Sequence, residues 1–384
     1  MKVIICINTA WNLVNFRSGL IRALVRAGHE VVAVSPYDAF ASSLEGLGCR
    51  FVELPMDNGG TNPLRDVLLL WRFWRLLNRE SAEVFLAYTV KPNVYGSMAA
   101  HFMKIPVINN IAGLGVVFGK SGFILKIVQT LYLLSLSRSA KVFFQNKEDL
   151  QIFLKSNLVR PEIVELLPGS GVDLKHFAAV PLPSSERGVK IFRFLLIARM
   201  LWEKGVGEFV EAAALIRSNW PQAECYLLGF LDVQNPGAIS RAQMDELAAS
   251  GITYLGESND VRVEIAQADC IVLPSYYREG VPRVLLEAAS MARPIITTDS
   301  VGCRDAVEDG VNGYLCKVRD VKDLANKMEL MLSLTTEQLS EMGIQGRAKM
   351  EREFDEQLVI DKYLAAIETI EEKNRKINCK NYCH

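Results

Sequence analysis

Short apolar runs alternate with longer stretches of helical periodicity along most of the chain. The series opens with VIICIN and EVVAVSP, which flank the helix-like stretch LIRALVRAG, and it continues to KVFFQN at residues 141–146. Continuous apolar runs bounded by turn residues are typical of buried strands, and strands that alternate with helices form parallel sheets. The first part of the chain is therefore predicted to be a doubly wound parallel sheet.

A second series of the same kind begins at Phe192. Its apolar runs are FRFLLIAR, ECYLLG, ITYLG, DCIVLPS and PIITTDS, and helical stretches such as EFVEAAALI and VRVEIAQA separate them. The segment HFAAVPLPSSERGVK between the two series combines prolines and paired serines with a loss of periodicity, which is typical of a linker. The predicted parts are a first domain at 1–173, a linker at 174–190, a second domain at 191–354, a C-terminal helix at 355–370 that packs back on the first domain, and a frayed tail at 371–384.

The fold class that follows is α/β, with two doubly wound, Rossmann-like domains facing each other across a cleft. A chain of 384 residues is long for one packed core, which agrees with two domains. Open parallel sheets bind ligands beyond the carboxyl ends of their strands. Functional residues are therefore expected in the strand-to-helix loops of both domains.

Charge and cysteine content narrow the classes of partner. The formal net charge of −1 gives no reason to expect a nucleic-acid partner. None of the eight cysteines has the spacing of a disulfide framework or a zinc site, so we expect a reducing cytoplasm and no metal site. We also expect no cofactor. The start, MKVIICINTAW, is typical of a strand rather than a signal peptide, and no stretch has the length and purity of a spanning helix.

The stretch REGVPRVLLE carries two carboxylates, Glu279 and Glu287, around the start of an apolar helix. Pro282 suits a first helical turn, and the helix is expected to begin near Val281. One interpretation is an ordinary surface ion pair between Arg283 and Glu287. The other is that both carboxylates follow the apolar strand DCIVLPS into the cleft, where the hydroxyl groups of a sugar would donate to them.

A second loop, IARMLWEKGV, places two cations between a strand and a helix. Arg199 ends the strand FRFLLIAR, and Lys204 with Gly205 precedes the next helix. Two cations in one such loop could grip a diphosphate, the arginine by a forked contact and the lysine as a mobile point charge. The alternative is that Lys204 forms a surface ion pair with Glu203 or Glu208.

In combination these stretches resemble the retaining nucleotide-sugar glycosyltransferases of the GT-B fold, family four. The shared pattern is Arg199 with Lys204 and Gly205, the stretch PSYYREGVPRVLLEA with its two glutamates, and GVNGYLC at 310–316. In the first domain NFRSGLIRAL, TVKPNVYGSMAA and AGLGVVFG resemble bacterial enzymes, such as capsular and O-antigen glycosyltransferases, that extend polyprenyl-diphosphate-linked sugars. The stretch LLIARMLWEKGVGEF resembles the PglA-type N-acetylgalactosaminyltransferases.

The resemblance implies roles for these residues. Arg199 and Lys204 would bind the donor diphosphate, Glu287 the ribose hydroxyls, and Glu279 the hydroxyls of the donor sugar. The implied donor-binding set is Arg199, Lys204, Gly205, Glu279, Gly280, Val281 and Glu287, and the implied catalytic set is Glu279, Arg199 and Lys204. The acceptor would attack the face from which the diphosphate leaves, a leaving phosphate oxygen would take its proton, and neither a metal nor a side-chain base is implied.

The first domain departs from the family pattern. Many relatives carry a glycine pair after the first strand and a histidine in the acceptor region, whereas WNLVNFRSG holds only Gly19 and TVKPNVYG holds Lys91. How this domain assists the leaving phosphate and orients the acceptor is therefore open. The predicted acceptor-binding residues are Arg17, Lys91 and Lys120.

Basic and aromatic side chains share the amphipathic stretch RDVLLLWRFWRLLNR at 65–79. They are Arg72, Arg75, Arg79, Trp71, Phe73 and Trp74. Such a helix suits an anionic bilayer surface, although a core-packed helix with extended arginines is the alternative. Together with GFILKIVQTLYLLSLSR, it predicts a peripheral protein at the cytoplasmic face of the inner membrane.

The predicted reaction moves a hexose or N-acetylhexosamine, with N-acetylgalactosamine favoured, from a UDP-sugar to a polyprenyl-diphosphate-linked saccharide in bacterial glycan or glycoprotein assembly. One rival is a nucleotide-sugar epimerase built on the same two-domain plan. Another is a sugar or lipid binder without catalytic activity. A dinucleotide-binding protein is disfavoured because no G-x-G-x-x-G motif follows the first strand.

Overall fold

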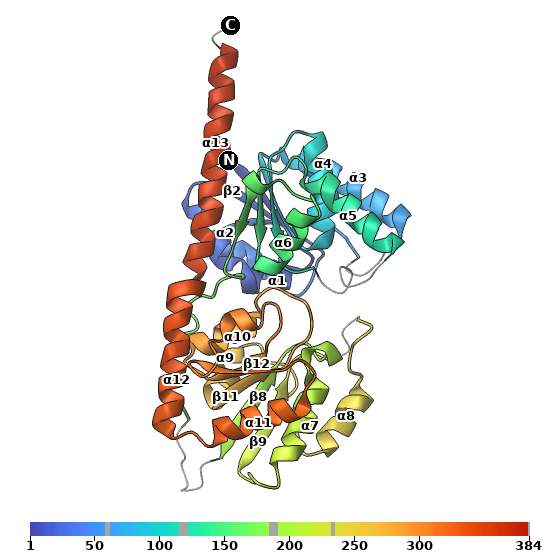
Figure 1. Cartoon of the computed structure of the whole chain (residues 1–384). Helices are drawn as coiled ribbons and strands as arrows, with labels where there is room; N and C mark the ends of the chain where they lie inside the picture. The colour runs from blue at the N-terminus through green and yellow to red at the C-terminus, as the bar shows by residue number, and fades with distance from the viewer. Residues whose placement is uncertain (58–61, 115–121, 184–190, 232–234, 383–384) are drawn as a thin grey trace. The chain divides into compact units, whose positions relative to one another are not determined.

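The chain divides into two units in the computed structural model, which describes residues 1–57, 62–114, 122–183, 191–231 and 235–382 (Figure 1). The first unit contains Met1–Ser170 and Glu356–His384, and the second contains Gly171–Asp355. The C-terminal segment of the chain therefore belongs to the first unit.

The first unit is built on a seven-stranded sheet with the order β3-β2-β1-β4-β5-β6-β7 within the described residues, and each strand pair is parallel. The strands are β1 (Lys2–Cys6), β2 (Glu30–Ser35), β3 (Arg50–Glu53), β4 (Val84–Tyr88), β5 (Val107–Ile111), β6 (Lys141–Phe144) and β7 (Val164–Leu166). The order reverses between β1 and β4, where Val3 pairs with Val84. Ligands of doubly wound sheets bind beside such a reversal, beyond the carboxyl ends of the strands.

Helices cover both faces of this sheet. On one face lie α1 (Ala10–Phe16), α2 (Ser18–Arg26) and α13 (Glu356–Tyr382). On the other lie α3 (Pro63–Glu80), α4 (Ser97–Phe102), α5 (Phe123–Leu136) and α6 (Lys147–Lys155). Because β1 alternates its side chains between two hydrophobic cores, Val3 to Cys6 are all buried and the strand is continuously apolar.

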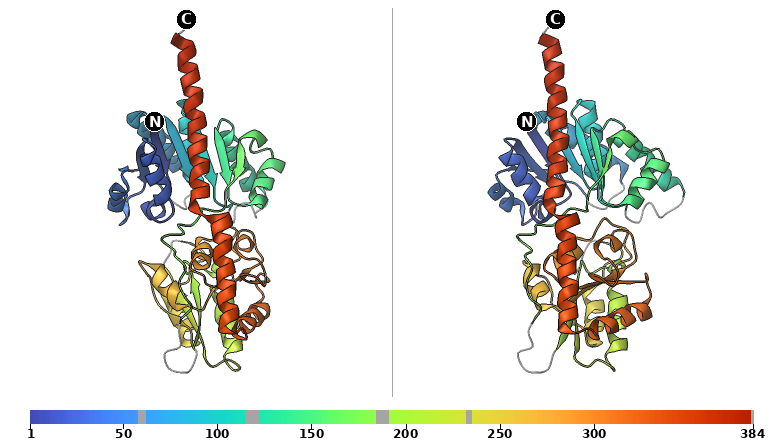
Figure 2. Two further views of the ribbon diagram at one scale, coloured as in Figure 1. Left: turned by 90° about the vertical axis from the view of Figure 1, so that its left-hand side faces the viewer. Right: turned by 60° about the vertical axis from the view of Figure 1, so that its left-hand side comes forward.

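The long helix α13 packs against α2 and the strands of the first unit, and Figure 2 shows its course. Val359, Tyr363 and Ile367 lie in the core that it shares with α2. Their spacing of four residues keeps these side chains on one face of the helix.

The expected frayed tail from residue 371 onward is wrong for most of its length, because α13 continues to Tyr382. Ile370 is still buried in the core, and the Glu371 carboxylate lies 3.9 Å from the N-terminal amine of Met1. These contacts fix the helix beyond the point at which the apolar pattern in the sequence fades.

The second unit is built on a six-stranded parallel sheet with the order β10-β9-β8-β11-β12-β13 within the described residues. The strands are β8 (Phe192–Ile197), β9 (Ala223–Leu228), β10 (Thr253–Tyr254), β11 (Cys270–Leu273), β12 (Ile295–Thr298) and β13 (Gly313–Cys316). The order reverses between β8 and β11. The prediction of two doubly wound parallel sheets is confirmed.

Helices again lie on both faces. One core contains residues of α7 (Val206–Ile216), α8 (Arg241–Ala249), α11 (Val321–Leu332) and α12 (Thr336–Lys349), and the core on the other face contains residues of α9 (Val261–Gln267) and α10 (Arg283–Ser290). The helix α10 begins two residues later than expected, because Pro282 is its extended N-cap residue rather than a member of its first turn.

The boundary between the units differs from the expected linker at 174–190. The division falls between Ser170 and Gly171. Phe177 is buried in a core of the second unit, and its carbonyl oxygen accepts a hydrogen bond from Arg347. The first part of the expected linker is therefore an integral part of the second unit.

Candidate active site

Three neighbouring strands direct their following loops to one edge of the second sheet. Strand β11 lies between β8 and β12, with Cys270 paired with Phe194 and Ile271 paired with Ile295. Since all three strands are parallel, their carboxyl ends meet at the same edge. Most of the residues predicted to bind a nucleotide sugar lie in the loops after β8 and β11.

Gly205 allows the loop after β8 to approach the loop after β11. Its φ is +78°, a left-handed conformation, and a Cβ atom there would lie 2.2 Å from the carbonyl oxygen of Pro274. Only glycine fits such a position without movement of the backbone. The glycine after Lys204 therefore sets the distance between the two loops.

Hydrogen bonds join these loops directly. The carbonyl oxygen of Glu203 accepts from the backbone N–H groups of Tyr276 at 3.0 Å and Tyr277 at 3.1 Å, and from the hydroxyl of Ser275 at 3.3 Å. The two loops therefore form a single surface, and side chains that follow Glu203 are held beside side chains that follow Ser275.

Lys204 and Glu279 meet on this surface. The Lys204 ammonium donates a hydrogen bond to the Glu279 carboxylate and lies 5.5 Å from the centre of the Tyr277 ring. Lys204 is only 7% exposed, whereas a quarter of the Glu279 side chain remains open to solvent. The alternative pairing of Lys204 with Glu203 or Glu208 is not formed.

The loop after β12 packs against the loop that carries Glu279. We did not predict its residues from the sequence. The hydroxyls of Thr298 and Ser300 both donate to the carbonyl oxygen of Ser275. A Cβ on Gly302, whose φ is +83°, would lie 2.2 Å from the carbonyl oxygen of Gly280. The hydroxyl residues at the end of PIITTDS and the glycine two residues after it were the available signal, because such residues follow a strand where another backbone approaches closely.

Glu287 lies in α10, the helix that follows the Glu279 loop, and has a different partner. Its carboxylate accepts from Arg283 Nε at 3.1 Å, and both side chains are 11% exposed. The pair of the simpler interpretation therefore exists, but it is buried rather than on a wet face. Burial raises the pKa of Glu287, and the charge and hydrogen bond of Arg283 offset part of that rise.

The other predicted donor residues, Arg199, Gly280 and Val281, take up two different environments. Arg199 lies two residues after the end of β8 and is exposed, and its side chain forms no hydrogen bond or ion pair with the residues described. Gly280 and Val281 are buried between Glu279 and the start of α10. The structure thus joins Lys204 to Glu279 and leaves Arg199 exposed at the same sheet edge.

The GVNGYLC stretch has a structural role. Asn312 is buried, and its side chain accepts from the backbone N–H of Glu308 at 2.6 Å and donates to the carbonyl oxygen of Ala306 at 3.0 Å. A Cβ on Gly313 would lie 2.1 Å from the carbonyl oxygen of Ile295. These residues fix β13 against β12.

The acceptor candidates of the first unit differ from one another. Arg17 is buried between α1 and α2, over the ring of Tyr88. Lys91 follows β4, and its ammonium lies 3.1 Å from Asp66, which also accepts from the hydroxyl of Tyr95. Lys120 lies outside the described residues.

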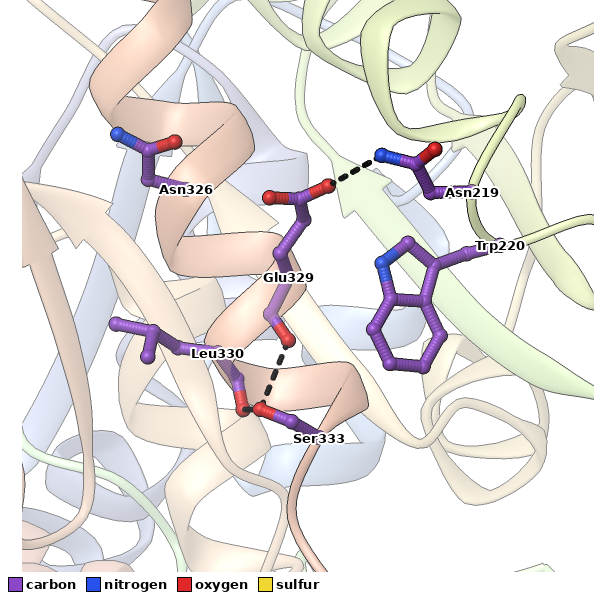
Figure 3. A pocket seen from close by; sticks show the side chains of 6 residues that line it. All are labelled: Asn219, Trp220, Asn326, Glu329, Leu330 and Ser333. Carbon is purple, nitrogen blue, oxygen red and sulfur yellow. Dashed lines mark hydrogen bonds between the residues drawn. The ribbon is translucent and has the colours of Figure 1, made fainter.

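A surface hollow in the second unit lies away from these loops. Figure 3 shows Glu329 and Asn219 on opposite walls, joined by a hydrogen bond of 3.5 Å, with Trp220 beside them. Trp220 lies before β9 and therefore at the amino end of that strand, opposite the edge where ligands of such sheets bind. We do not assign the nucleotide-sugar site to it.

Two further observations concern metals and membranes. Among residues with described side chains, no group of three or more His, Cys, Asp or Glu is placed to hold a metal ion. In the same part of the chain, no helix is both long enough and apolar enough to cross a bilayer.

Two parallel-sheet units with nucleotide-sugar candidates at the carboxyl ends of the strands define the GT-B class. A solved structure of the Anabaena protein HepE with UDP-glucose shares this fold, with a TM-score of 0.75 over 97% of this chain and 100% of that one at 18% identity. Residues 15–169 match the model of the glycosyl transferase 4-like domain, and residues 191–333 match that of the glycosyl transferases group 1.

The chain belongs to the glycosyltransferase family that these two models describe. A similar curated protein is the N,N'-diacetylbacillosaminyl-diphospho-undecaprenol alpha-1,3-N-acetylgalactosaminyltransferase of Campylobacter jejuni, 27% identical over 92% of this chain and 94% of the relative. Another is the UDP-Gal:alpha-D-GlcNAc-diphosphoundecaprenol alpha-1,3-galactosyltransferase of Escherichia coli, 25% identical over 69% of this chain and 70% of the relative.

Proposed function

We propose that this protein is a retaining glycosyltransferase that moves N-acetylgalactosamine, or a closely related hexose, from a UDP-sugar to a polyprenyl-diphosphate-linked saccharide. The two curated relatives are named for transfers to diphospho-undecaprenol acceptors, and they match most of this chain. The observation that carries the proposal is the contact between Lys204 and Glu279 at the reversal of the second sheet.

Binding of the donor diphosphate replaces the ion pair between Lys204 and Glu279. In the free protein Glu279 neutralises the charge of Lys204. When a diphosphate binds, its oxygens accept hydrogen bonds from Lys204 and from the exposed guanidinium of Arg199. The Glu279 carboxylate is then free to accept a hydrogen bond from a hydroxyl of the donor sugar. The same carboxylate therefore keeps the lysine neutralised before binding and orients the sugar afterwards.

Glu287 is proposed to bind the ribose. Arg283 engages its Oε1 atom, and a carboxylate can accept more hydrogen bonds than this one. Its burial favours a partner that donates without carrying a net charge, as a sugar hydroxyl does. Gly205, Gly280 and Val281 are proposed to line the pocket with backbone atoms.

The chemical step uses the leaving group as its base. The acceptor oxygen bonds to the anomeric carbon on the face from which UDP leaves, the bond between that carbon and the phosphate oxygen breaks, and the phosphate oxygen takes the acceptor's proton. The described histidines have other partners: His101 bonds to the carbonyl oxygen of Ser135, His176 to Arg262, and His29 to the N-terminal amine. Arg199 and Lys204 supply the positive charge for the leaving diphosphate, and we propose that no divalent cation is required.

The first unit is proposed to bind the cytoplasmic face of the inner membrane through α3 and α5. Both helices lie on one face of the sheet. Their large exposed apolar residues include Leu64, Val67, Leu68, Trp71 and Trp74 of α3 and Ile124, Ile127, Leu133 and Leu134 of α5. Phe73, which we expected in this surface, is instead fully buried in the core.

The charges beside this apolar surface favour an anionic bilayer. The only acidic residues of α3, α4 and α5 are Asp66 and Glu80, and both are neutralised, by Lys91 and by Arg50 with Arg79. An apolar surface with exposed cations and paired acids suits a membrane rich in anionic lipid. The diphosphate of a lipid-linked acceptor would lie at that interface.

The experiment that tests the reaction uses full-length protein with a panel of UDP- and GDP-sugars and a polyprenyl-diphosphate-linked saccharide. We expect transfer from UDP-N-acetylgalactosamine or a related UDP-sugar, unchanged by EDTA, with retention read by NMR. An inverted product would refute the mechanism. Epimerisation of the nucleotide sugar without transfer would identify the rival enzyme class, and donor binding without turnover would identify a binding protein.

A further inference from the structure

The first unit buries a cation, Arg17, that no residue in the described part of the chain neutralises. Arg17 lies between α1 and α2 and is 6% exposed. One of its terminal nitrogens donates to the carbonyl oxygen of Phe16 at 3.2 Å, and its Nε atom is buried without a hydrogen-bond partner. No carboxylate of the described residues comes within ion-pair distance of its guanidinium.

Burial of such a group is unfavourable unless a partner is supplied. An arginine stays protonated in proteins, so it cannot relieve the cost by losing its charge. The aromatic face of Tyr88, whose centre lies 4.5 Å from the guanidinium carbon, attracts the cation but does not replace an anion. A buried cation with an empty donor is a position prepared for an anionic ligand.

Neighbouring residues fix the position of Arg17. The ring of Tyr88 stacks on that of Tyr363 from α13, with centres 6.0 Å apart and planes at 29°. The hydroxyl of Tyr363 accepts from the Asn110 side chain at 2.9 Å, and Asn110 accepts from Gln145 at 3.0 Å. Residues at the carboxyl ends of β4, β5 and β6 are thus joined to α13 behind the guanidinium.

The first turn of α2 adds a second feature. Arg17 is its N-cap residue, and no side chain caps this helix end. The carboxylate of Glu356 lies beside the turn, 2.6 Å from where a Cβ on Gly19 would be. An anion of the chain therefore already lies next to this helix end, where the helix dipole favours negative charge.

We infer that Arg17 is the cationic centre of a phosphoanion site at the carboxyl end of the first sheet, and that Tyr363 of α13 positions it through Tyr88. The ligand is a diphosphate ester. Its source is either the lipid-linked acceptor or the departing nucleotide, and this assignment of the source rests on the proposed function. The site explains how the first unit acts without a glycine pair after β1.

The first test measures binding without turnover. Inorganic pyrophosphate is titrated by calorimetry into the full chain carrying Arg199→Ala and Lys204→Ala, which removes the donor cations, and into the same protein with Arg17→Met added. We expect Arg17→Met to weaken the remaining binding by about tenfold or more, a difference of about one unit in log Kd. Arg22→Met, an exposed arginine on α2, serves as the control and should leave binding unchanged.

The second test separates function from folding. Since no described residue supplies a counter-charge to Arg17, Arg17→Met should leave the thermal midpoint equal to or above that of the wild-type protein. A fall in the midpoint together with unchanged pyrophosphate binding would show that Arg17 is structural and would overturn the inference. Weakened binding without loss of stability supports it.

Kinetics then identify the source of the diphosphate and test Tyr363. A higher KM for the acceptor alone in Arg17→Met indicates the acceptor diphosphate, and a higher KM for the donor with weaker UDP inhibition indicates the departing nucleotide.

The role of Tyr363 is tested by two variants. Tyr363→Leu should raise the same KM, whereas Tyr363→Phe, which keeps the ring, should leave that KM close to the wild-type value. Equal effects of both on kcat alone would refute positioning. Pyrophosphate binding in a protein without transferase activity would refute only the proposed reaction.

Discussion

Arg17 and Arg293 are both buried arginines, one in each unit, and the chain treats them differently. Arg293 is fully buried and donates to the carbonyl oxygens of Val180, Pro181, Ile265, Ala266, Met291 and Ala292. Arg17 donates one hydrogen bond to a carbonyl oxygen. The difference separates a cation that holds a fold together from one that is prepared for a ligand.

Lys204 stands between these two cases. It is almost as buried as Arg17, but it has a charged partner in Glu279, and that partner is itself partly exposed. Substrate can therefore replace the interaction without unfolding either loop. The comparison predicts that loss of Arg293 affects stability, loss of Lys204 affects turnover, and loss of Arg17 affects anion binding.

The largest effect is expected for Arg293→Met. Burial lowers the pKa of Arg293 to about 10, with Asp269 offsetting part of the shift, so the side chain is charged at neutral pH. Each buried carbonyl oxygen left without a donor costs about 1–3 kcal/mol, and the loss should be about 3 kcal/mol or more. Urea denaturation of this variant beside Arg17→Met measures it, and equal stabilities would remove the distinction between the two arginines.

A loss of turnover, rather than of stability, is expected for Lys204→Ala. The variant removes a cation from the leaving diphosphate, and loss of one such electrostatic contact lowers kcat by about 100- to 1000-fold. Steady-state transfer assays measure the change, and circular dichroism checks the fold. Lys322→Ala, an exposed lysine on α11, is the matched control. Normal kcat in Lys204→Ala would show that the ion pair with Glu279 is only structural.

The proposed membrane surface on α3 concerns exposed rather than buried side chains. Replacing both Trp71 and Trp74 of α3 with serine removes partly exposed aromatic surface, and vesicle binding should fall about tenfold. Flotation with vesicles containing anionic lipid measures it. Tyr37→Ser, which removes an exposed aromatic residue from the loop after β2, is the control. If both variants float like the wild type, α3 does not bind the bilayer.

The smallest effect concerns the pH dependence of stability at Glu287. Burial raises the pKa of Glu287 in the folded protein above its ordinary value of 4.5. At pH values between the unfolded-state and folded-state pKa, the folded protein therefore binds more protons than the unfolded chain. The contribution of Glu287 to stability therefore falls as pH rises through this window. Glu287→Gln should flatten that part of the profile in denaturation experiments from pH 4 to 7, whereas Glu246→Gln, an exposed site on α8, should leave it unchanged. A steeper profile in Glu287→Gln would contradict the assignment.

The sequence alone determined the repeating architecture and the residues worth examining. Strands buried on both faces, such as Val3–Cys6, must be continuously apolar, and helices that cover them must be amphipathic, so the pattern could be read directly. The cation and carboxylate loops were also visible, because a charged residue directly after a buried strand lies at the sheet edge. These signals are local along the chain.

Tertiary structure decided which of these charges have partners. Lys204 and Glu279 are 75 residues apart, and only the adjacency of β8 and β11 brings them together. The isolation of Arg17 likewise depends on Tyr88 and on Tyr363 of α13, which approach it from distant parts of the chain. The free energy of a buried charge depends on every group around it in space, and sequence order does not specify that set of neighbours.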